Sequence, residues 1–230
     1  MQRPIFANDE IYHIYNRGVE KRNVFLNEKV YFRFILNLFE FNDIAPAENT
    51  YYRNVYEVGP RKIEKQRECL VEILAFCLMP NHYHFMMRQK VENGITEFMR
   101  KIGTGYTMYF NKKYERVGAL FQGKFKAILI KEEAHFQYLP QYIHFNPLDL
   151  IAPEWREKEI LDIEKTMQFL EQYRWSSHLD YLGKKNFPSI TQRDFLLQCF
   201  GGQEQYKKDT FNMLKEMHKK FEYFDDIIIE

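Results

Sequence analysis

The 230-residue sequence contains only three cysteines, Cys69, Cys77 and Cys199. An odd number at these spacings fits neither a disulfide framework nor a CxxC metal knuckle, so we expect reduced, structural thiols. The chain also lacks an apolar run near the ~20 residues that span a bilayer, and its first residues show no basic stretch leading into an apolar one. These absences predict a soluble, cytoplasmic protein that has no membrane partner.

The sequence also has no large excess of charge of one sign, because it contains 33 Lys and Arg residues and 32 Asp and Glu residues. The distribution is less even: from Arg88 to Lys131 ten basic residues stand against three acidic ones, with tyrosines and phenylalanines between them. Basic residues interleaved with aromatic ones are the mixture that binds phosphates and stacks bases. A solvated helix face over an aromatic core gives the same composition, so both interpretations stay open.

Periodicity and turn residues predict seven elements in the order strand, helix, strand, strand, helix, strand, helix. We expect them at residues 10–16, 28–42, 71–80, 82–89, 95–115, 121–131 and 132–146. Asn27 would cap the first helix, Pro80 and Asn81 would turn a hairpin, and Pro147 would end the last helix. The nearly continuous apolar run from Val71 indicates a buried central strand, and the polar segment 43–68 a variable loop.

This order is a split βαβ arrangement, which predicts the α+β class, with a mainly antiparallel sheet and helices packed on one face. We expect residues 1–150 to form this domain and residues 151–230 a mainly helical C-terminal extension. The extension would contain a loop at 153–156, a helix opened by Thr191 and another helix at about 203–222.

Two histidines, His82 and His84, stand two residues apart on the predicted strand 82–89. Alternate residues of a strand share one face of the sheet, so both imidazoles should point the same way. Histidine commonly ligates divalent ions, and a pair on a rigid hairpin is pre-oriented for one. The same spacing also fits two half-exposed histidines that pack against a helix.

Tyr142 and Asn146 lie four residues apart, and therefore on one face, at the end of the last predicted helix of this domain. An amide oxygen can ligate a hard cation such as Mg²⁺, and a tyrosine can be a covalent nucleophile. The chain has 16 tyrosines, and most of them must be core or surface residues. Spacing alone therefore does not single out Tyr142.

Four motifs, in order along the chain, carry a resemblance to a known family. They are YHIYNRGVEKRNVF, LMPNHYHFMM, the segment from FMRKIG to NPLDLIA, and YRWSSHLDYLG. Together they cover roughly residues 11–42 and 71–183 and resemble the REP-associated tyrosine transposases, relatives of the single-tyrosine insertion-sequence transposases. The resemblance implies a ferredoxin-like sheet with the tyrosine on a late helix, which agrees with the element order above.

By position, the resemblance makes His82 and His84 the pair of the family's His-hydrophobic-His motif, Tyr142 the nucleophile and Asn146 the third metal ligand. It implies a nucleoid-associated enzyme, a monomer or a homodimer, that uses Mg²⁺ or Mn²⁺. The enzyme would cut and rejoin single-stranded DNA beside a hairpin through a 5′-phosphotyrosine intermediate. The candidates for phosphate contacts, with salt-dependent affinity, are Arg100, Lys101, Lys124 and Lys126.

The sequence departs from the family pattern at two positions. Tyr83, between the histidines, is aromatic rather than aliphatic, and we expect it on the opposite face of the strand. Pro140 removes a hydrogen bond inside the helix that carries Tyr142, at a cost of ~3 kcal/mol. The helix should therefore either restart at Pro140 or kink there. The family patch at residues 175–177 is interpreted as packing.

Two alternatives remain on the sequence alone. A catalytically inactive DNA- or RNA-binding regulator could keep the same fold, although the four retained residues argue against it. A nuclease that hydrolyses DNA with a metal-activated water would need the histidines but not Tyr142. Replacing Tyr142 by Phe separates the three readings, because only the transposase-type enzyme loses both cleavage and a covalent adduct.

Overall fold

A computed structural model describes residues 3–46, 67–157, 160 and 162–216 of the chain. Most of the loop predicted at 43–68, and the predicted end of the last helix near residue 222, therefore lie outside the described residues. The three cysteines form no disulfide, as expected. Among the described helices, none combines the length and the hydropathy that a membrane span requires.

Four antiparallel strands form one sheet in the order β2-β3-β1-β4. Their bounds are Ile11–Arg17 for β1, Val71–Met79 for β2, His82–Gln89 for β3 and Lys126–Leu129 for β4. The hairpin around Pro80 and Asn81 is confirmed. The fourth strand is shorter than the predicted 121–131, because Gly123 adopts a left-handed backbone with φ +71° and the chain bends before Phe125.

β2 lies at an edge of the sheet, so the prediction of a central strand at this position is wrong. Its apolar run is buried nonetheless, because the C-terminal extension covers the edge. Leu78 N donates to Trp175 O (2.8 Å), Ser177 N donates to Phe76 O (3.0 Å) and Gln192 N donates to Ile73 O (3.0 Å). The extension thus satisfies the strand's outer backbone groups and shields an edge that would otherwise invite pairing.

Two helices cover one face of the sheet: α1 (Glu28–Glu40) and α2 (Gly94–Lys113). The side chain of Asn27 caps α1 by accepting from Val30 N, as predicted. β3 turns Tyr83 towards these helices, where its ring lies 5.5 Å from that of Phe34. This layer is the larger aromatic core, and burying its rings is the main contribution to its stability.

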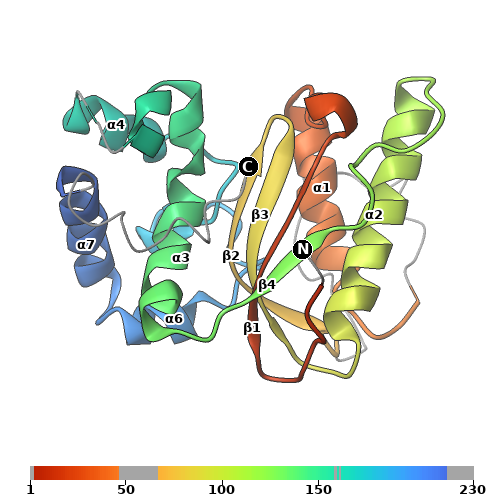
Figure 1. Ribbon diagram of the computed structural model, residues 1–230, viewed down its shortest axis with the longest axis horizontal. Helices are drawn as coiled ribbons and strands as arrows, with labels where there is room; N and C mark the ends of the chain where they lie inside the picture. The colour runs from red at the N-terminus through yellow and green to blue at the C-terminus, as the bar shows by residue number, and fades with distance from the viewer. Residues whose placement is uncertain (1–2, 47–66, 158–159, 161, 217–230) are drawn as a thin grey trace.

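The opposite face of the sheet is covered as well, so the expectation of helices on one face only is corrected (Figure 1). There α3 (Glu133–Phe145) packs on β2 and β3. The 3₁₀ helix η2 (Asn146–Leu150) follows α3 directly. The extension adds a 3₁₀ helix at Pro153–Glu157 (η3), where a loop was expected, and the helices α4 (Ile163–Leu170), α5 (His178–Tyr181), α6 (Arg193–Cys199) and α7 (Gln203–Lys215). A third short 3₁₀ helix, η1 (Val19–Lys21), follows β1. The physical reason for the second layer is that β2 is apolar on both faces, and β3 adds Met86 to the second face, so each face requires a covering layer.

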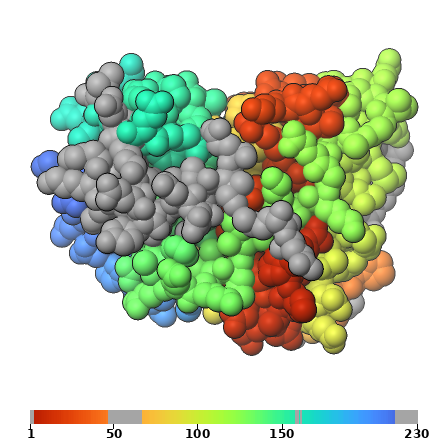
Figure 2. Space-filling model, in the orientation of Figure 1, coloured from red at the N-terminus to blue at the C-terminus, as the bar shows by residue number. Residues whose placement is uncertain are grey.

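A buried polar network joins α3 to the extension. His144 contacts Ser177 Oγ through Nε2 and Tyr206 Oη through Nδ1, both at 2.7 Å, and His178 Nδ1 contacts the same hydroxyl at 2.7 Å. In the space-filling view, the extension, in teal and blue, and the N-terminal residues, in red, occupy opposite halves of one face (Figure 2). The extension and α3 therefore share one core, while the division at residue 150 stays a prediction.

Candidate active site

The histidine pair lies on the face of the sheet that α3 covers. Side chains alternate along β3, so His82 and His84 point away from the core that holds Tyr83. The two imidazole centroids are 5.0 Å apart. The predicted common face of the histidines is confirmed, and Tyr83 leaves it unobstructed.

Hydrogen bonds orient both imidazoles through Nδ1. His82 Nδ1 lies 2.6 Å from Asn81 Oδ1, and Asn81 Nδ2 donates to Lys21 O, which fixes the orientation of the Asn81 amide. His84 Nδ1 lies 2.8 Å from Nε2 of His13, a residue of β1. Because an amide oxygen only accepts, His82 carries its proton on Nδ1 and keeps the Nε2 lone pair. A partner at Nδ1 is the usual arrangement for a histidine that binds a metal through Nε2.

Burial keeps both imidazoles neutral. It lowers the pKa of His82 to about 4, with Arg17 adding to the effect. Burial, followed by the neighbouring His82 and His13, lowers the pKa of His84 well below its usual value. At neutral pH each ring therefore retains one lone pair, which is the form that coordinates a cation.

α3 brings Tyr142 to the histidines. The Tyr142 ring lies edge-on to His84 and to His13, with centroid distances of 5.8 and 6.0 Å. α3 is continuous through Pro140, so it does not restart there, and it ends at Phe145 before Pro147 as predicted. Although only 1% of Tyr142 is exposed, it lines a cleft with the histidines rather than lying in a closed core.

Asn146 occupies the C-cap of α3 and is fully buried. Its Nδ2 donates to Tyr142 O at 2.8 Å, which closes the helix end and directs Oδ1 the other way. Asn146 acts on the pKa of His82, so its side chain lies close to that imidazole. The structure thus gathers the four residues predicted for the site, His82, His84, Tyr142 and Asn146, although they come from two separate parts of the chain.

A cleft that is lined by His82, His84 and Tyr142 has a volume of about 40 Å³. It is lined by Tyr15, Asn16, Arg17, His82, His84, Tyr142, Asp149 and Arg156. One water needs roughly 10–15 Å³ of such space, so an ion with one or two waters fits and a nucleotide does not.

Sequence reasoning missed several residues of this site. His13 could have been found, because it alternates with Tyr12 and Ile14 on a predicted strand and so must face the other side of the sheet. Nothing in the sequence pattern singled out Asp149 or Arg156, which reach the cleft from η2 and η3.

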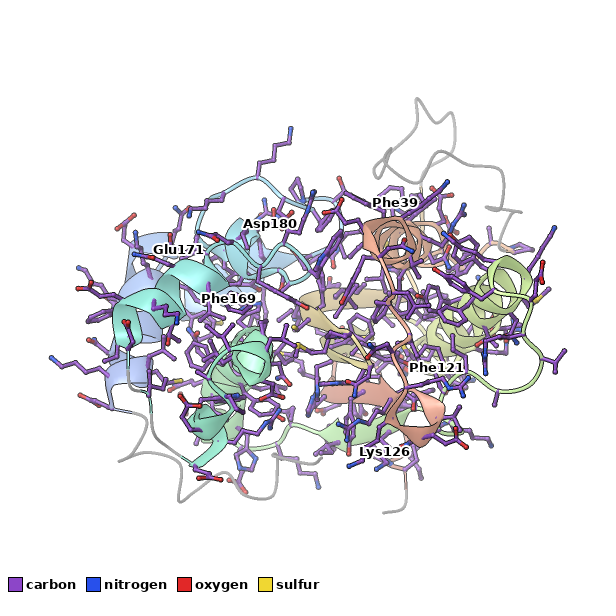
Figure 3. All side chains as sticks on the ribbon, turned by 90° about the horizontal axis from the view of Figure 1, so that it is seen from above. Phe39, Phe121, Lys126, Phe169, Glu171 and Asp180 are labelled. Atoms are coloured by element: carbon purple, nitrogen blue, oxygen red, sulfur yellow. The ribbon has the colours of Figure 1, made fainter. Side chains whose placement is uncertain are left out.

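The four predicted phosphate contacts have different surroundings. Lys124 and Lys126 are exposed, and Lys126 Nζ lies 5.7 Å from the ring of Tyr15 at the cleft. Figure 3 shows Lys126 on β4, at the margin of the sheet between the two helical layers. Arg100 and Lys101 belong to α2, on the opposite layer from the histidines.

Lys101 does not fit the expectation of a phosphate contact. It is 7% exposed, and its Nζ donates to the carbonyls of Asp43 (2.6 Å) and Ala45 (2.8 Å). The ammonium thus anchors the segment after α1. Arg100 is exposed, but its guanidinium forms two hydrogen bonds with Glu97, which partly neutralises its charge.

The patch at residues 175–177 packs as interpreted. Trp175 stacks on Tyr31 with centroids 4.4 Å apart, and Ser177 Oγ accepts from Phe76 N at 2.9 Å. The patch therefore covers the edge of β2 and lines no part of the cleft.

A known family model matches the region of the sequence that contains the site. Residues 52–146 match the family model described as "Transposase IS200 like". The match covers less than half of the chain. The match agrees with the resemblance seen in the sequence. The matched range includes His82, His84, Tyr142 and Asn146, and it ends before Asp149.

A solved structure of a REP-associated tyrosine transposase bound to a REP hairpin is similar in fold. The two chains align with a TM-score of 0.50 and 10% sequence identity, over 83% of this chain and 89% of the other. An identity this low establishes a shared fold, here the α+β sheet with its helices, and nothing finer. No curated protein sequence gives a significant match.

The donor chemistry of the site fits the divalent cation that the family implies. With Nδ1 of His82 bonded to Asn81, its Nε2 lone pair is available, and Asn146 offers the amide oxygen Oδ1. An imidazole nitrogen and an amide oxygen both ligate divalent cations. The described residues hold no cluster of three His, Cys, Asp or Glu side chains suited to a metal, so a site here would combine two imidazoles with an amide oxygen.

Proposed function

We propose that this protein cleaves and rejoins single-stranded DNA through a covalent link to Tyr142. The observation that carries the proposal is that Tyr142 and the imidazole pair line one cleft large enough for a hydrated ion. The Asn146 amide lies next to this cleft, where its Oδ1 accepts from Arg156. Likeness to a transposase bound to a hairpin suggests a substrate in which a single strand lies beside a DNA hairpin.

His82, His84 and Asn146 would hold Mg²⁺ or Mn²⁺ through two Nε2 atoms and one Oδ1 atom. The bound ion would supply charge neutralisation at a non-bridging oxygen of the scissile phosphate. Asn81 and His13 fix the imidazoles by bonding their Nδ1 atoms, so the ligands are oriented before DNA arrives.

The chain's own residues perform the transfer. The phenol oxygen of Tyr142 forms a bond to phosphorus as the bond from phosphorus to the 3′-oxygen breaks. Tyr142 loses its proton and the leaving 3′-oxygen gains one, so the products are a 5′-phosphotyrosine and a free 3′-hydroxyl. The reverse attack by a 3′-hydroxyl rejoins the strand, because the phosphotyrosine keeps the phosphodiester bond energy.

Exposed lysines near the cleft are suited to hold the DNA backbone. We propose that Lys124 and Lys126 contact phosphates, since both are exposed and Lys126 lies beside Tyr15 at the cleft. Arg100, on the other layer, is a weaker candidate because Glu97 pairs with it.

The test uses labelled single-stranded hairpins from the flanks of the protein's own gene, incubated with Mg²⁺ or Mn²⁺. We expect wild-type protein to cut the strand and to form a protein–DNA adduct that resists denaturation. Tyr142→Phe should bind DNA but form neither product. Tyr181→Phe is the matched control, because it removes an equally buried phenol outside the cleft, and it should retain activity.

The alternatives give different results. A hydrolytic nuclease would still cut DNA as Tyr142→Phe, and a pure binding protein would retain the hairpin without cutting it in either form. Either outcome would overturn the proposal.

A further inference from the structure

The residue that stands out at the cleft beyond the proposed ligands and nucleophile is Arg156. It comes from η3 in the extension, ten residues beyond the end of the family match at residue 146. Its position therefore follows from this chain's own structure. The guanidinium lines the cleft with Tyr142, His82 and His84.

A carboxylate holds the Arg156 guanidinium rigidly. Nε donates to Asp149 Oδ1 at 2.8 Å and Nη2 donates to Oδ2 at 2.7 Å, which is the bidentate fork that gives Arg its geometric precision. Trp155 Nε1 donates to the same Asp149 at 2.6 Å and so fixes the carboxylate in turn. The Arg156 side chain is 18% exposed, so little solvent screens its charge.

The same guanidinium contacts two groups of the proposed reaction centre. It hydrogen bonds the side chain of Tyr142. Nη2 also reaches Asn146 Oδ1 at 3.4 Å. Burial alone would lower the pKa of Arg156, but the bonds to Asp149 and the proximity of Tyr142 raise it, so the residue stays a cation.

The geometry of in-line attack determines which groups the Arg156 guanidinium contacts when DNA is bound. In-line attack requires the phosphorus to lie about 3–3.5 Å from the Tyr142 oxygen. A donor that already bonds this oxygen is within reach of the phosphate oxygens at the same moment. An arginine fork suits both groups, since it offers several donors in one plane.

On the basis of the proposed function, we propose that Arg156 is a catalytic residue supplied by the extension, which donates to the attacking oxygen of Tyr142 and to a non-bridging oxygen of the scissile phosphate. Asp149 is its positioning residue. As the oxygen–phosphorus bond forms and the bond to the 3′-oxygen breaks, negative charge leaves the phenol oxygen and spreads over the phosphate. The guanidinium faces both positions and stabilises the charge throughout the transfer.

The competing explanation is that the Arg156–Asp149 pair only ties η2 to η3. Arg88 provides a matched control for it. Arg88 is similarly exposed (21%), pairs with Glu72 and lies 4.4 Å from the Phe195 ring, as Arg156 pairs with Asp149 and lies 4.8 Å from the Trp155 ring. It stands at the opposite end of β3 from His82.

The experiment measures the rate of adduct formation, the Kd for the hairpin and the melting temperature of full-length wild type, Arg156→Ala, Arg156→Lys and Arg88→Ala. We expect Arg156→Ala to form the adduct about 100- to 1,000-fold more slowly, as when one donor to a developing anion is removed. Its Kd should change only a few-fold. Free guanidinium ion, below unfolding concentrations, should restore part of the rate in Arg156→Ala and none in Tyr142→Phe.

Arg156→Lys keeps the charge and the aliphatic stem, and it serves if the alanine variant unfolds. We expect it to fold and to react at least 10-fold more slowly, because one ammonium cannot both hold Asp149 and reach the phenol. A wild-type rate in folded Arg156→Lys, or a loss in Arg156→Ala that Arg88→Ala reproduces and guanidinium does not restore, would overturn the proposal. If wild type itself forms no adduct, the proposed function fails instead.

Discussion

The contact between His13 and His84 leads to a quantitative prediction for metal affinity. His84 can ligate through Nε2 only with its proton on Nδ1, and that proton must then be donated to His13 Nε2, 2.8 Å away. Both residues are buried, at 4% and 1% exposed, so no water replaces the partner. Replacing His13 by Phe keeps a ring of similar size and leaves the His84 Nδ1 proton unsatisfied.

The expected size of the effect follows from that loss. A buried donor without a partner costs about 1–3 kcal/mol, which corresponds to a roughly 5- to 150-fold weaker Kd if the cost falls on the ligating tautomer. Outer partners of metal-binding histidines have effects of about 10–100-fold, in the same range. We therefore expect His13→Phe to bind Mn²⁺ about 10–100-fold more weakly.

Calorimetric titration of the DNA-free protein with Mn²⁺ measures this directly and does not depend on activity. His13→Gln should recover part of the affinity, because its amide oxygen can accept the proton that His13 Nε2 accepted. His178→Phe is the control, since it removes a buried histidine outside the cleft and should leave the Kd unchanged. An unchanged Kd in folded His13→Phe would refute the reasoning.

Two further predictions concern charge. Lys126→Gln should weaken DNA binding and reduce the slope of log K against log salt by about 1. Lys101→Gln should leave that slope unchanged and lower the free energy of unfolding by about 1–3 kcal/mol, because the buried ammonium of Lys101 bonds two backbone carbonyls. Equal slopes for the two variants would contradict their placement. Burial lowers the pKa of His178 to about 4 from 6.5, so the unfolded chain binds more protons between these values. The contribution of such a histidine to the free energy of unfolding should be complete above pH 6.5 and should fall by about 1.4 kcal/mol per pH unit as the pH drops towards 4. A free energy of unfolding, measured with urea, that does not change from pH 7 to 5 would contradict this prediction.

The sequence predicted those features that depend on local pattern. Strand alternation placed His82 and His84 on one face, and the cap at Asn27 and the stop at Pro147 fixed two helix ends. These features are set by a few neighbouring residues, so a single sequence contains them.

Features that depend on distant contacts were not predictable. The apolar run of β2 is equally consistent with a central strand and with an edge strand, and only the pairing of the strands in the folded chain, in the order β2-β3-β1-β4, decides between them. The burial of Lys101 depends on carbonyls some 56 residues away, and Arg156 reaches Tyr142 only because η2 and η3 fold back over the end of α3. Periodicity contains no information about such returns of the chain.

The most direct test of the account is to locate the DNA on the protein after reaction. Trypsin should release the peptide from Glu132 to Arg156, which contains Tyr138 and Tyr142. Fragmentation by mass spectrometry after nuclease trimming distinguishes the two tyrosines. We predict a 5′-linked nucleotide on Tyr142 alone, formed only with Mg²⁺ or Mn²⁺. A nucleotide on Tyr138 or on any other residue, or cut DNA with this peptide unmodified, would contradict it.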